Sequence, residues 1–329
     1  MLRRYLEPAY AFLIAVAFVP GISGAATSPR WTVAALSLWF LDWRVLWFPA
    51  VCFAVLEFDQ ACHWAIVSGA FCWGMNNAEN TKRTFTTLPV TLGFCAGIAI
   101  SGAIAIAQAT VGFSTIPQAI SPAGLFVNKN VMGEAAVLAF IAAASARLWP
   151  AALICVPAVI LSQSRAAWLA TFAGLFMLAS FRMRCLLLSL ALLLSALFWF
   201  TGFELSTSSL MERFAIWRDA ISHLTLFGNG SYDYSTVQHR EPNLHNDWLQ
   251  FVYELGIVGL IPIAVVGFAG ISGGLPFVAA LFVLGSFGFP LHNPASAWFA
   301  AFVIGYFVRV GLNEGRISIR PWHQNPQLC

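Results

Sequence analysis

Arginine and histidine side chains around one long polar segment, 201–248, are the first candidates for chemistry in this sequence. An arginine at a membrane surface can bind a lipid phosphate, and Arg213 and Arg218 are both candidates for that role. Histidine has an unperturbed pKa of about 6.5, so His245 can accept a proton near neutral pH and act as a general base. The alternatives are that both arginines only anchor lipid headgroups and that His245 only caps a helix or marks the interface.

Three further positions could add to such a site. Arg165 ends the motif Ser162-Gln163-Ser164-Arg165 beside an apolar run, and an arginine near a bilayer is costly unless it has a function or can extend to the surface. Lys129 opens another apolar run and is expected mainly as an anchor. His292 lies in a turn with no basic cluster beside it in sequence, and we interpret it as a turn residue, with a place in the lining of the site as the alternative. Asn246, next to His245, is both a candidate substrate ligand and a good helix-start residue.

A helix is needed to present the two loop arginines. Ser209 and Glu212 have the spacing of a capping box, and Gly228-Asn229-Gly230 is a stop signal, so the sequence predicts a helix between them. Its apolar residues recur at intervals of three and four and form one stripe: Leu210, Phe214, Trp217, Ile221 and Leu224. Such a helix can lie flat at a membrane surface.

On the same helical wheel, Arg213 and Arg218 lie about 140° apart, on opposite flanks of the stripe. They are poorly placed to bind one phosphate together, so we favour Arg213 for the site and Arg218 as support. Trp217 is one turn from Arg213 and can hold its side chain in place.

The composition indicates the environment of these residues. The chain has 329 residues, of which 59% are hydrophobic, 15% aromatic and only 9% charged. Soluble globular proteins carry about 25% charged residues. The composition therefore excludes a soluble enzyme, a disordered chain, a collagen-like rod and a disulfide-stapled mini-protein, and it predicts a polytopic membrane protein. The net charge of +3 is too small to indicate a nucleic-acid partner.

The expected fold is all-α: an integral membrane bundle of about twelve transmembrane helices in one domain, 1–329, with one long external loop, 201–248, that holds the amphipathic helix. The apolar runs are 9–19, 31–41, 45–56, 61–75, 88–110, 131–146, 149–161, 166–181, 185–200, 249–268, 275–290 and 295–311. Several are shorter than the ~20 residues of a full span, and the pair 31–41 and 45–56 could be one hairpin or one bent span. The first run is expected as an uncleaved span rather than a signal peptide.

The distribution of basic residues predicts the orientation. With twelve spans that start inside, both termini are cytoplasmic, and eleven of the 17 basic residues share that side. The six on the opposite side are Arg30, Lys129, Arg165, Arg213, Arg218 and Arg240. Most of these lie at or beside 201–248, and a loop of this length in a compact membrane protein is usually functional.

Metal and cofactor sites are not expected. The seven cysteines are scattered and form no C-x-x-C pair, so neither a disulfide framework nor a metal site is inferred from them. The sequence also has no carboxylate pair or His/Cys cluster that would demand a metal.

Taken in order, the motifs resemble the O-antigen ligase and polymerase superfamily of bacterial membrane glycosyltransferases. The residues that carry the resemblance are Asn128-Lys129-Asn130, Ser164-Arg165, Arg213-x-x-x-Trp217, Phe227-Gly228-Asn229-Gly230, His245-Asn246 and Glu254-Leu255-Gly256. The resemblance covers about residues 120–265, and the N-terminal runs match in hydrophobicity alone. The order, the spacing and the shared outer side make the combination fairly specific.

The resemblance implies transfer of a glycan from a polyprenyl (undecaprenyl) pyrophosphate carrier to an acceptor hydroxyl, on the periplasmic face of the bacterial inner membrane. The acceptor would be a lipid A–core sugar, another carrier-linked glycan or a protein hydroxyl. Arg165 and Arg213 would bind the pyrophosphate, and His245 would be the base. The remaining candidates around the substrate are Arg218, Asn246, Lys129, Trp217 and His292. The reaction would need no metal and would invert the anomeric carbon, and a hydrophobic groove between spans would hold the polyprenyl tail.

Other functions are kept as alternatives. Within the superfamily we favour a ligase-like activity, with a polymerase second and a protein acceptor last. A transporter or lipid-glycan flippase would place charged residues deep within spans and break helices at mid-membrane, whereas here the polar residues gather on one face. A scaffolding protein would not bring arginines beside a histidine in space.

Overall fold

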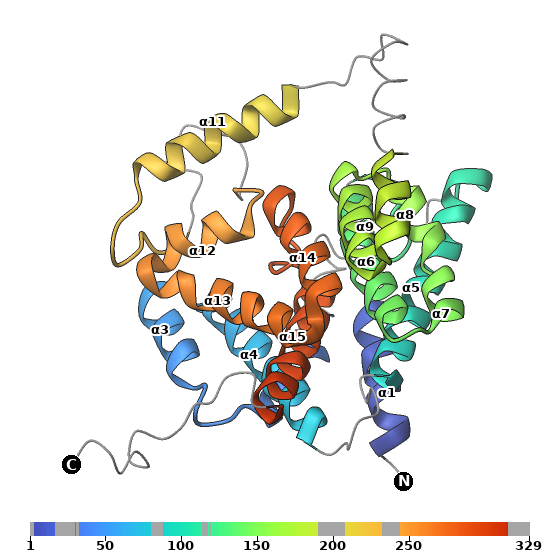
Figure 1. The fold of residues 1–329 in the computed structure, drawn as a ribbon. Helices are drawn as coiled ribbons and strands as arrows, with labels where there is room; N and C mark the ends of the chain where they lie inside the picture. The colour runs from blue at the N-terminus through green and yellow to red at the C-terminus, as the bar shows by residue number, and fades with distance from the viewer. Residues whose placement is uncertain are drawn as a thin grey trace.

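The computed structural model describes residues 3–16, 30, 33–79, 88–113, 118, 120–189, 208–231 and 244–314. Within these ranges the regular elements are all helical, and no β-strand is present (Figure 1). The architecture is that of an all-α membrane protein, in agreement with the composition.

The helices fall into two groups, one before and one after the polar segment. The first group is α1 (Arg3–Val16), the 3₁₀ helix η1 (Ala35–Phe40), α3 (Trp47–Val55), α4 (Phe58–Glu79), α5 (Leu88–Val111), α6 (Lys129–Ser145), α7 (Trp149–Leu153), α8 (Val156–Ser162) and α9 (Arg165–Leu178). The second is α11 (Ser208–Ser222), α12 (Asp247–Leu255), the 3₁₀ helix η3 (Gly256–Gly259), α13 (Leu260–Ala269), the π-helical turn η4 (Gly270–Gly274), α14 (Leu275–Phe287) and α15 (Pro294–Asn313).

Three helical segments of the described chain are long and apolar enough to cross a membrane: Pro89–Val111, Asp247–Phe287 and Pro294–Asn313. The second runs from α12 to α14 and is kinked at Gly273, whose φ of 108° only glycine adopts readily. The expected runs 31–41 and 45–56 instead contain η1 and α3, which at about 1.5 Å per residue are too short to cross about 30 Å of hydrocarbon. The number of twelve spans therefore stays a prediction.

Long helix pairs form the body of the molecule: α4 packs along α15, α1 along α5, and α9 along α14. α6 contacts α5, α8, α9 and α14, and every residue from 132 to 144 is buried. Most of these residues are alanine or other small residues, which let neighbouring helices approach closely. α6 is thus the central helix around which the candidate site is assembled.

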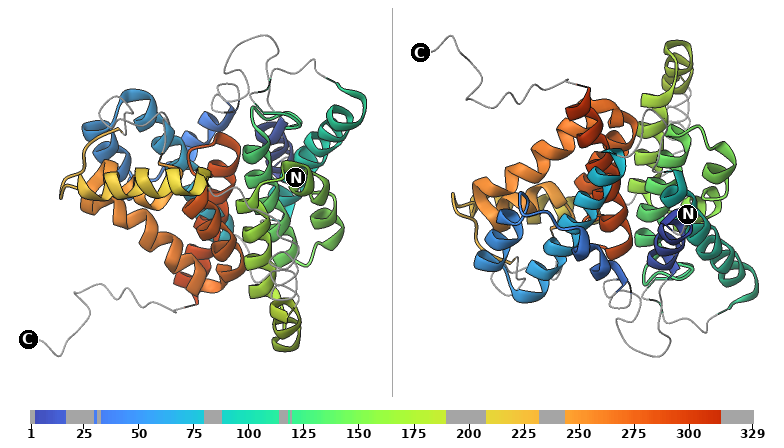
Figure 2. Two further views of the ribbon diagram at one scale, coloured as in Figure 1. Left: turned by 90° about the horizontal axis from the view of Figure 1, so that it is seen from above. Right: turned by 90° about the horizontal axis from the view of Figure 1, so that it is seen from below.

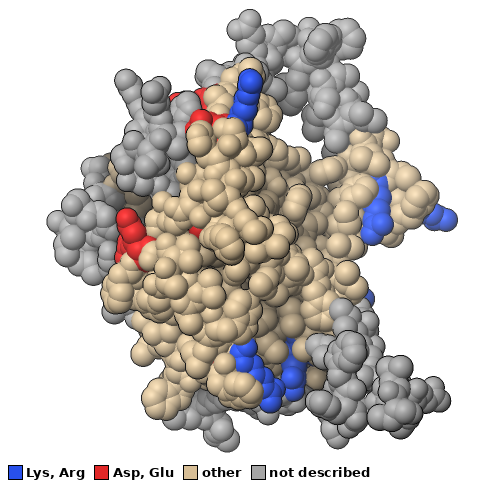
Figure 3. All heavy atoms as spheres, turned by 90° about the vertical axis from the view of Figure 1, so that its left-hand side faces the viewer, with Lys and Arg blue, Asp and Glu red and all other residues tan. Residues whose placement is uncertain are grey.

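α11 lies across one end of the molecule, while the first turn of α1 and the last turn of α15 lie at the other end (Figure 1). The views along the vertical axis show α14 and α15 between the α3–α4–α13 group and the α5–α6–α9 group (Figure 2). On the face drawn in Figure 3, charged side chains surround a broad uncharged centre. This distribution suits a protein whose middle contacts lipid.

Candidate active site

α11 confirms the predicted loop helix, although it ends at Ser222 rather than near Gly228. The helix docks through Ile216 and Ala220, which are each 1% exposed and pack with Leu244 and Tyr253. The most hydrophobic stripe does not dock, since Phe214 and Ile221 of that stripe are 48% and 56% exposed. Ile216 and Ala220 therefore dock, Phe214 and Ile221 stay on the surface, and Trp217 of the stripe is half-buried beside the docked face.

The two arginines of α11 point in different directions. The Nη1 atom of Arg213, which is half-buried, donates a hydrogen bond to the backbone carbonyl of Phe287 at the end of α14. Arg218 is exposed. Trp217 lies next to the docked face, and its indole N–H donates to the carbonyl of Leu244 at 2.7 Å. Trp217 thus fastens α11 to the residue directly before His245.

A second set of contacts joins the loop after α11 to the end of α12. These contacts link two of the motifs noted in the sequence. The backbone N–H groups of Asn229 and Gly230 donate to the carbonyls of Tyr253 and Glu254, at 2.8 and 3.2 Å, and the N–H of Ile257 donates to Leu226 at 3.0 Å. The segments Phe227-Gly228-Asn229-Gly230 and Glu254-Leu255-Gly256 are therefore direct partners.

Two glycines allow this contact. Gly228 has φ +81° and Gly256 has φ +59°, and a Cβ atom on either would lie 2.2 Å from a backbone oxygen of the opposite segment. Only glycine fits both the left-handed conformation and the close approach.

His245 lies at the start of α12 in a left-handed conformation, with φ 49°. Its imidazole is half-buried and packs on the ring of Phe289, with ring centroids 5.2 Å apart. Asn246 is the N-cap residue of α12, and its side-chain oxygen accepts a hydrogen bond from the N–H of Leu249 at 3.0 Å. The helix-start role considered for Asn246 is therefore present, and its role as a substrate ligand stays a prediction.

The segment 288–293, which we call the α14–α15 turn, is held by two buried acids. Asp247 is fully buried and accepts hydrogen bonds from the N–H of Leu291 at 2.8 Å and from Nδ1 of His292 at 2.6 Å. Glu134 of α6 is 3% exposed and accepts from the side chain of Asn293 at 2.9 Å and from the N–H of Phe289 at 3.4 Å.

Electrostatics at this turn favour the protonated form of His292. Burial alone would lower the pKa of His292, but the hydrogen-bonded carboxylate of Asp247 raises it above its ordinary value, and Glu254 and Glu134 act in the same direction. The positive charge of Arg213 also acts on the carboxylate of Glu134. The turn therefore combines buried acids with basic partners.

Lys129 and Arg165 are the first residues of α6 and α9. The Nζ atom of Lys129 donates to the side-chain oxygen of Gln163 at 2.8 Å. Gln163 belongs to the tight turn between α8 and α9, with φ 48°, and Arg165 is the first residue of α9, with its side chain exposed. Ser164 caps α9 by accepting from the N–H of Ala167 at 3.3 Å. The start of α6 and the start of α9 are thus neighbours.

Arg30, one of the basic residues expected on the outer side, is buried inside the protein rather than in contact with lipid. It is 2% exposed, donates to the carbonyls of Ala15 and Leu125, and lies over the ring of Phe126 at 4.1 Å. These contacts explain how an arginine can be buried at this position. Arg240 lies outside the described residues, as do parts of the long loop (201–207 and 232–243).

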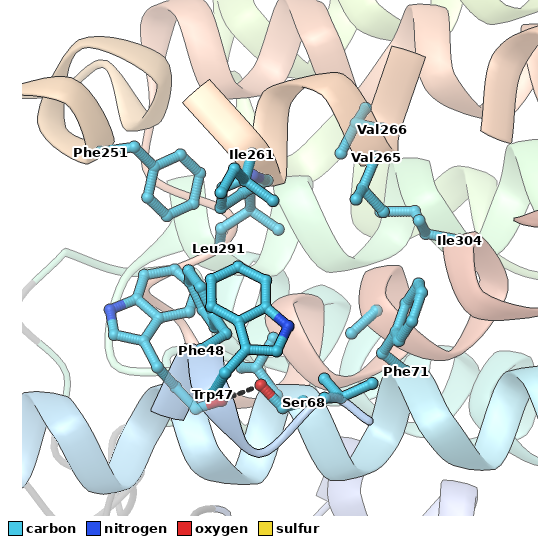
Figure 4. A pocket seen from close by; sticks show the side chains of 15 residues that line it. Trp47, Phe48, Ser68, Phe71, Phe251, Ile261, Val265, Val266, Leu291 and Ile304 are labelled. Carbon is cyan, nitrogen blue, oxygen red and sulfur yellow. Dashed lines mark hydrogen bonds between the residues drawn. The ribbon is translucent and has the colours of Figure 1, made fainter. Parts of the chain in front are cut away.

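Two apolar pockets flank this region. One, of about 140 Å³, lies between α3, α4, α13 and α15 and is lined by Trp47, Phe48, Phe71 and Ile304 (Figure 4); it reaches Leu291 of the α14–α15 turn. The other, of about 250 Å³, is formed by α6, α8 and α9 and is lined by Phe140, Val159, Ile160 and Trp168. Both can accept aliphatic chains, because their linings are almost wholly apolar.

The contacts join some of the predicted site residues directly. Arg213 binds the carbonyl of Phe287 and His245 packs on Phe289, so both meet one short stretch of chain. Lys129 opens α6 and binds Gln163 two residues before Arg165, and the same helix carries Glu134, which binds the α14–α15 turn. Among the described residues, no group of three or more His, Cys, Asp or Glu side chains could hold a metal ion.

Glu134 and Asp247 are not among the site residues that the sequence predicts. Glu134 is the single acid in the apolar run 131–146. An ionisable residue in such a run is costly and therefore marks a polar contact or a function, so this position could have been found from the sequence.

Comparisons with known proteins support the resemblance of the motifs. No curated protein matches the chain. A family model described as O-antigen ligase matches a region that contains Arg165, Arg213 and His245. The match supports a membrane glycosyltransferase of the O-antigen ligase or polymerase type at the family level. Residues 150–264 of the chain are thus similar to the O-antigen ligase family.

Proposed function

We propose that the chain transfers a glycan from a polyprenyl pyrophosphate carrier to an acceptor hydroxyl, at the periplasmic face of the bacterial inner membrane. The observation that carries the proposal is the meeting of Arg213 and His245 at residues 287 and 289. Residues two positions apart are separated by no more than about 7 Å along the backbone, so a phosphate-binding group and a base lie within reach of one substrate. The family match supports the same reaction class.

In this reaction the acceptor oxygen attacks the anomeric carbon, and the bond between that carbon and the pyrophosphate oxygen breaks. His245 accepts the hydroxyl proton, which makes the neutral acceptor a better nucleophile. The diphosphate stays on the carrier lipid and keeps the bonding electrons. Attack from the face opposite the leaving group inverts the anomeric carbon.

The leaving group needs positive charge because a diphosphate is released. Arg213 and Arg165 can each make charge-assisted, bidentate hydrogen bonds to phosphate oxygens, and such bonds strengthen as charge develops. Lys129, fixed beside the α8–α9 turn by Gln163, adds a third positive charge. These groups neutralise the diphosphate, so the reaction requires no metal.

We assign the polyprenyl tail to the pocket formed by α6, α8 and α9. Ile160 and Trp168 line that pocket on the two sides of the turn that leads to Arg165. A tail bound there would hold its diphosphate beside Arg165 and Lys129. Because the tail is already surrounded by apolar lipid, the pocket would act mainly by shape, and it would orient the carrier independently of the sugar.

The test is an assay with the purified full chain, an undecaprenyl pyrophosphate-linked glycan and two acceptors, lipid A–core and a second carrier-linked glycan. Glycan transfer with and without a chelator is the expected result. Transfer to lipid A–core identifies a ligase, and transfer to the carrier-linked glycan identifies a polymerase. No transfer to either acceptor, from a protein that is folded and binds the donor, would refute the proposal.

Two variants make this assay specific for the site. Arg213→Ala is expected to lower use of the donor by about 10²-fold or more, because it removes a charged donor from the leaving group. Arg218→Ala is the matched control, since Arg218 belongs to the same helix but is exposed, and it should lose far less. Equal and mild losses in both variants would indicate that the two arginines only anchor α11 at the membrane.

A further inference from the structure

Asp247 and His292 form a buried, hydrogen-bonded pair that joins α12 to the α14–α15 turn. The carboxylate of Asp247 is fully buried, and the side chain of His292 is 17% exposed. Their hydrogen bond, at 2.6 Å, is short, as expected for a charge-assisted bond. The other carboxylate oxygen holds the N–H of Leu291, so Asp247 binds two consecutive residues of the α14–α15 turn.

Aromatic rings enclose the imidazole of His292. The ring lies 5.5 Å from Trp64, 5.8 Å from His63 and 6.3 Å from Phe251. His63 in turn lies with its Nε2 atom 2.8 Å from the carbonyl of Leu291. The Nε2 atom of His292 is buried and has no hydrogen-bond partner among the described residues. The ring is therefore held on one edge by Asp247 and packed on its other sides.

The same turn contacts the two residues assigned to the reaction. Phe289, three residues before His292, packs on the imidazole of His245. Phe287, directly before the turn, accepts the hydrogen bond of Arg213. A displacement of the turn would move Phe289 and Phe287, and with them the surfaces against which His245 and Arg213 rest.

From this geometry we infer that His292 is a positioning residue: through Asp247 it holds the α14–α15 turn in the place that aligns His245 and Arg213 with the substrate. The inference rests on the proposed glycan transfer. It assigns to His292 a role that its position in the sequence, in a turn with no basic neighbour, does not indicate.

Charged and titratable groups face His292 from each helix packed around it. Asp247 and Glu254 belong to α12, Glu134 to α6 and His63 to α4. Its Nδ1 atom can donate to Asp247 in the imidazolium and also in one neutral tautomer. The positioning bond is thus retained on both sides of neutral pH, and His292 does not have to gain or lose a proton during the reaction.

The test compares His292→Ala with His292→Asn in the purified full chain. The asparagine amide can replace the Nδ1–H donor to Asp247 but cannot titrate, whereas alanine removes the bond. With an undecaprenyl pyrophosphate-linked glycan as donor, His292→Ala should lower kcat by about 10²-fold, the cost of a misplaced catalytic group. His292→Asn should retain most of the activity, with the acidic limb of its pH profile unchanged.

A second readout does not depend on transfer. The rate at which diethyl pyrocarbonate modifies His245, followed by mass spectrometry, should rise severalfold in His292→Ala, because Phe289 no longer covers the imidazole. It should stay at the wild-type value in His292→Asn. This readout separates failure of the inference from failure of the proposed function, because it decides the positioning role even when no acceptor is glycosylated.

Three results would overturn the inference. The first is an unchanged rate of His245 modification in His292→Ala. The second is equal loss of activity in the alanine and asparagine variants with normal modification of His245, which would make His292 itself the base. The third applies if His292→Ala does not fold. In that case His292→Leu, which fills more of the space than alanine but offers no hydrogen-bond donor to Asp247, takes its place, and a wild-type rate of His245 modification in that variant rejects the positioning role.

Discussion

At the scale of single residues, the backbone of His245 adopts a left-handed conformation, which limits the residues that fit at this position. A left-handed conformation costs most residues about 1–2 kcal/mol, and asparagine adopts it more readily than alanine does. With φ 49°, His245 is in this region. The backbone of His245 is thus strained, and strained residues are common at functional sites.

This strain leads to a prediction that separates chemistry from folding. His245→Asn and His245→Ala should both lower glycan transfer by about 10²-fold or more, since neither can act as a base. The asparagine variant should unfold at a higher temperature than the alanine variant, because it tolerates the left-handed backbone. Transfer rates and thermal unfolding of the detergent-solubilised chains measure the two effects. A fully active His245→Asn would remove His245 as the base.

A pH dependence of stability is predicted from His292. Its pKa is raised in the folded protein, because the carboxylate of Asp247 more than offsets the effect of burial. A raised pKa means that protonation favours the folded state: the contribution is complete below the unfolded value of about 6.5 and is lost as the pH rises through the folded value. The wild type should therefore lose more thermal stability than His292→Asn as the pH rises from about 6 through that range.

The control for this pH effect is His223→Asn. His223 follows α11 and its side chain is 62% exposed, so its removal changes the histidine count without touching a buried pair. Stability curves of wild type and His223→Asn should run parallel. Parallel curves for wild type and His292→Asn would contradict the predicted coupling to Asp247.

Arg213, Trp217 and His245 were proposed from the sequence because their types and order are informative without a structure, and their roles stay predictions. Buried partners were harder to predict. Glu134 was missed because its partners, Phe289 and Asn293, are more than 150 positions away along the chain. Contacts of such separation depend on how the helices pack, which local patterns do not specify.

At the scale of elements, the contact between the loop after α11 and the end of α12 depends on two glycines. Gly228→Ala and Gly256→Ala each combine a positive φ with a Cβ placed 2.2 Å from a backbone oxygen. We expect each to destabilise the protein by more than about 1–2 kcal/mol, the cost of the left-handed conformation alone. A backbone oxygen cannot move aside as a flexible side chain can.

Gly267→Ala is the matched control for these variants. Gly267 lies within α13, and a Cβ atom there would meet nothing within 4 Å. Since alanine has a higher helix propensity than glycine by up to about 1 kcal/mol, this variant should be as stable as the wild type or slightly more stable. Thermal unfolding of the three variants checks the prediction, and equal melting temperatures would contradict the close packing of the two segments.

The prediction of α11 shows what periodicity can and cannot establish. The described helix begins at Ser208, so Ser209 lies inside it and the predicted capping box does not mark its N-cap. The docked face was not predicted: Ile216 and Ala220 are buried, while Phe214 and Ile221 are exposed. In a membrane protein large apolar side chains can face lipid, so hydrophobicity alone does not distinguish the packed face from the lipid-facing one.

At the scale of the whole molecule, composition predicted the class of fold, and it could not predict the number of spans. The apolar pattern gives two runs here, 249–268 and 275–290, and the structure has α12, η3 and α13 before the non-helical backbone at Gly273 and α14 after it. Hydropathy records where the chain is apolar but not whether a helix bends, continues or turns back. Those outcomes depend on packing, such as that of Gly274 against Phe307.

The orientation of the site is the last prediction, and it follows from the two ends of the bundle. α11 carries the exposed Arg218, and the N–H of Glu57, just after α3, donates to the side chain of Ser231 on the same side. The segment 41–46, before α3, lies at the opposite end (Figure 1) and includes Trp43, which is 75% exposed. If the basic residues set the orientation, α11 faces the periplasm and Trp43 the cytoplasm.

Cysteine labelling in intact cells tests this orientation. Cys62, Cys185 and Cys329 are first replaced by serine, which leaves four buried cysteines as the unlabelled background: Cys52, Cys72, Cys95 and Cys155. A membrane-impermeant maleimide should label Arg218→Cys in intact cells and Trp43→Cys only after permeabilisation, because the reagent cannot cross the bilayer. The reverse pattern would put His245 and Arg213 on the cytoplasmic face, where a donor presented to the periplasm could not reach them.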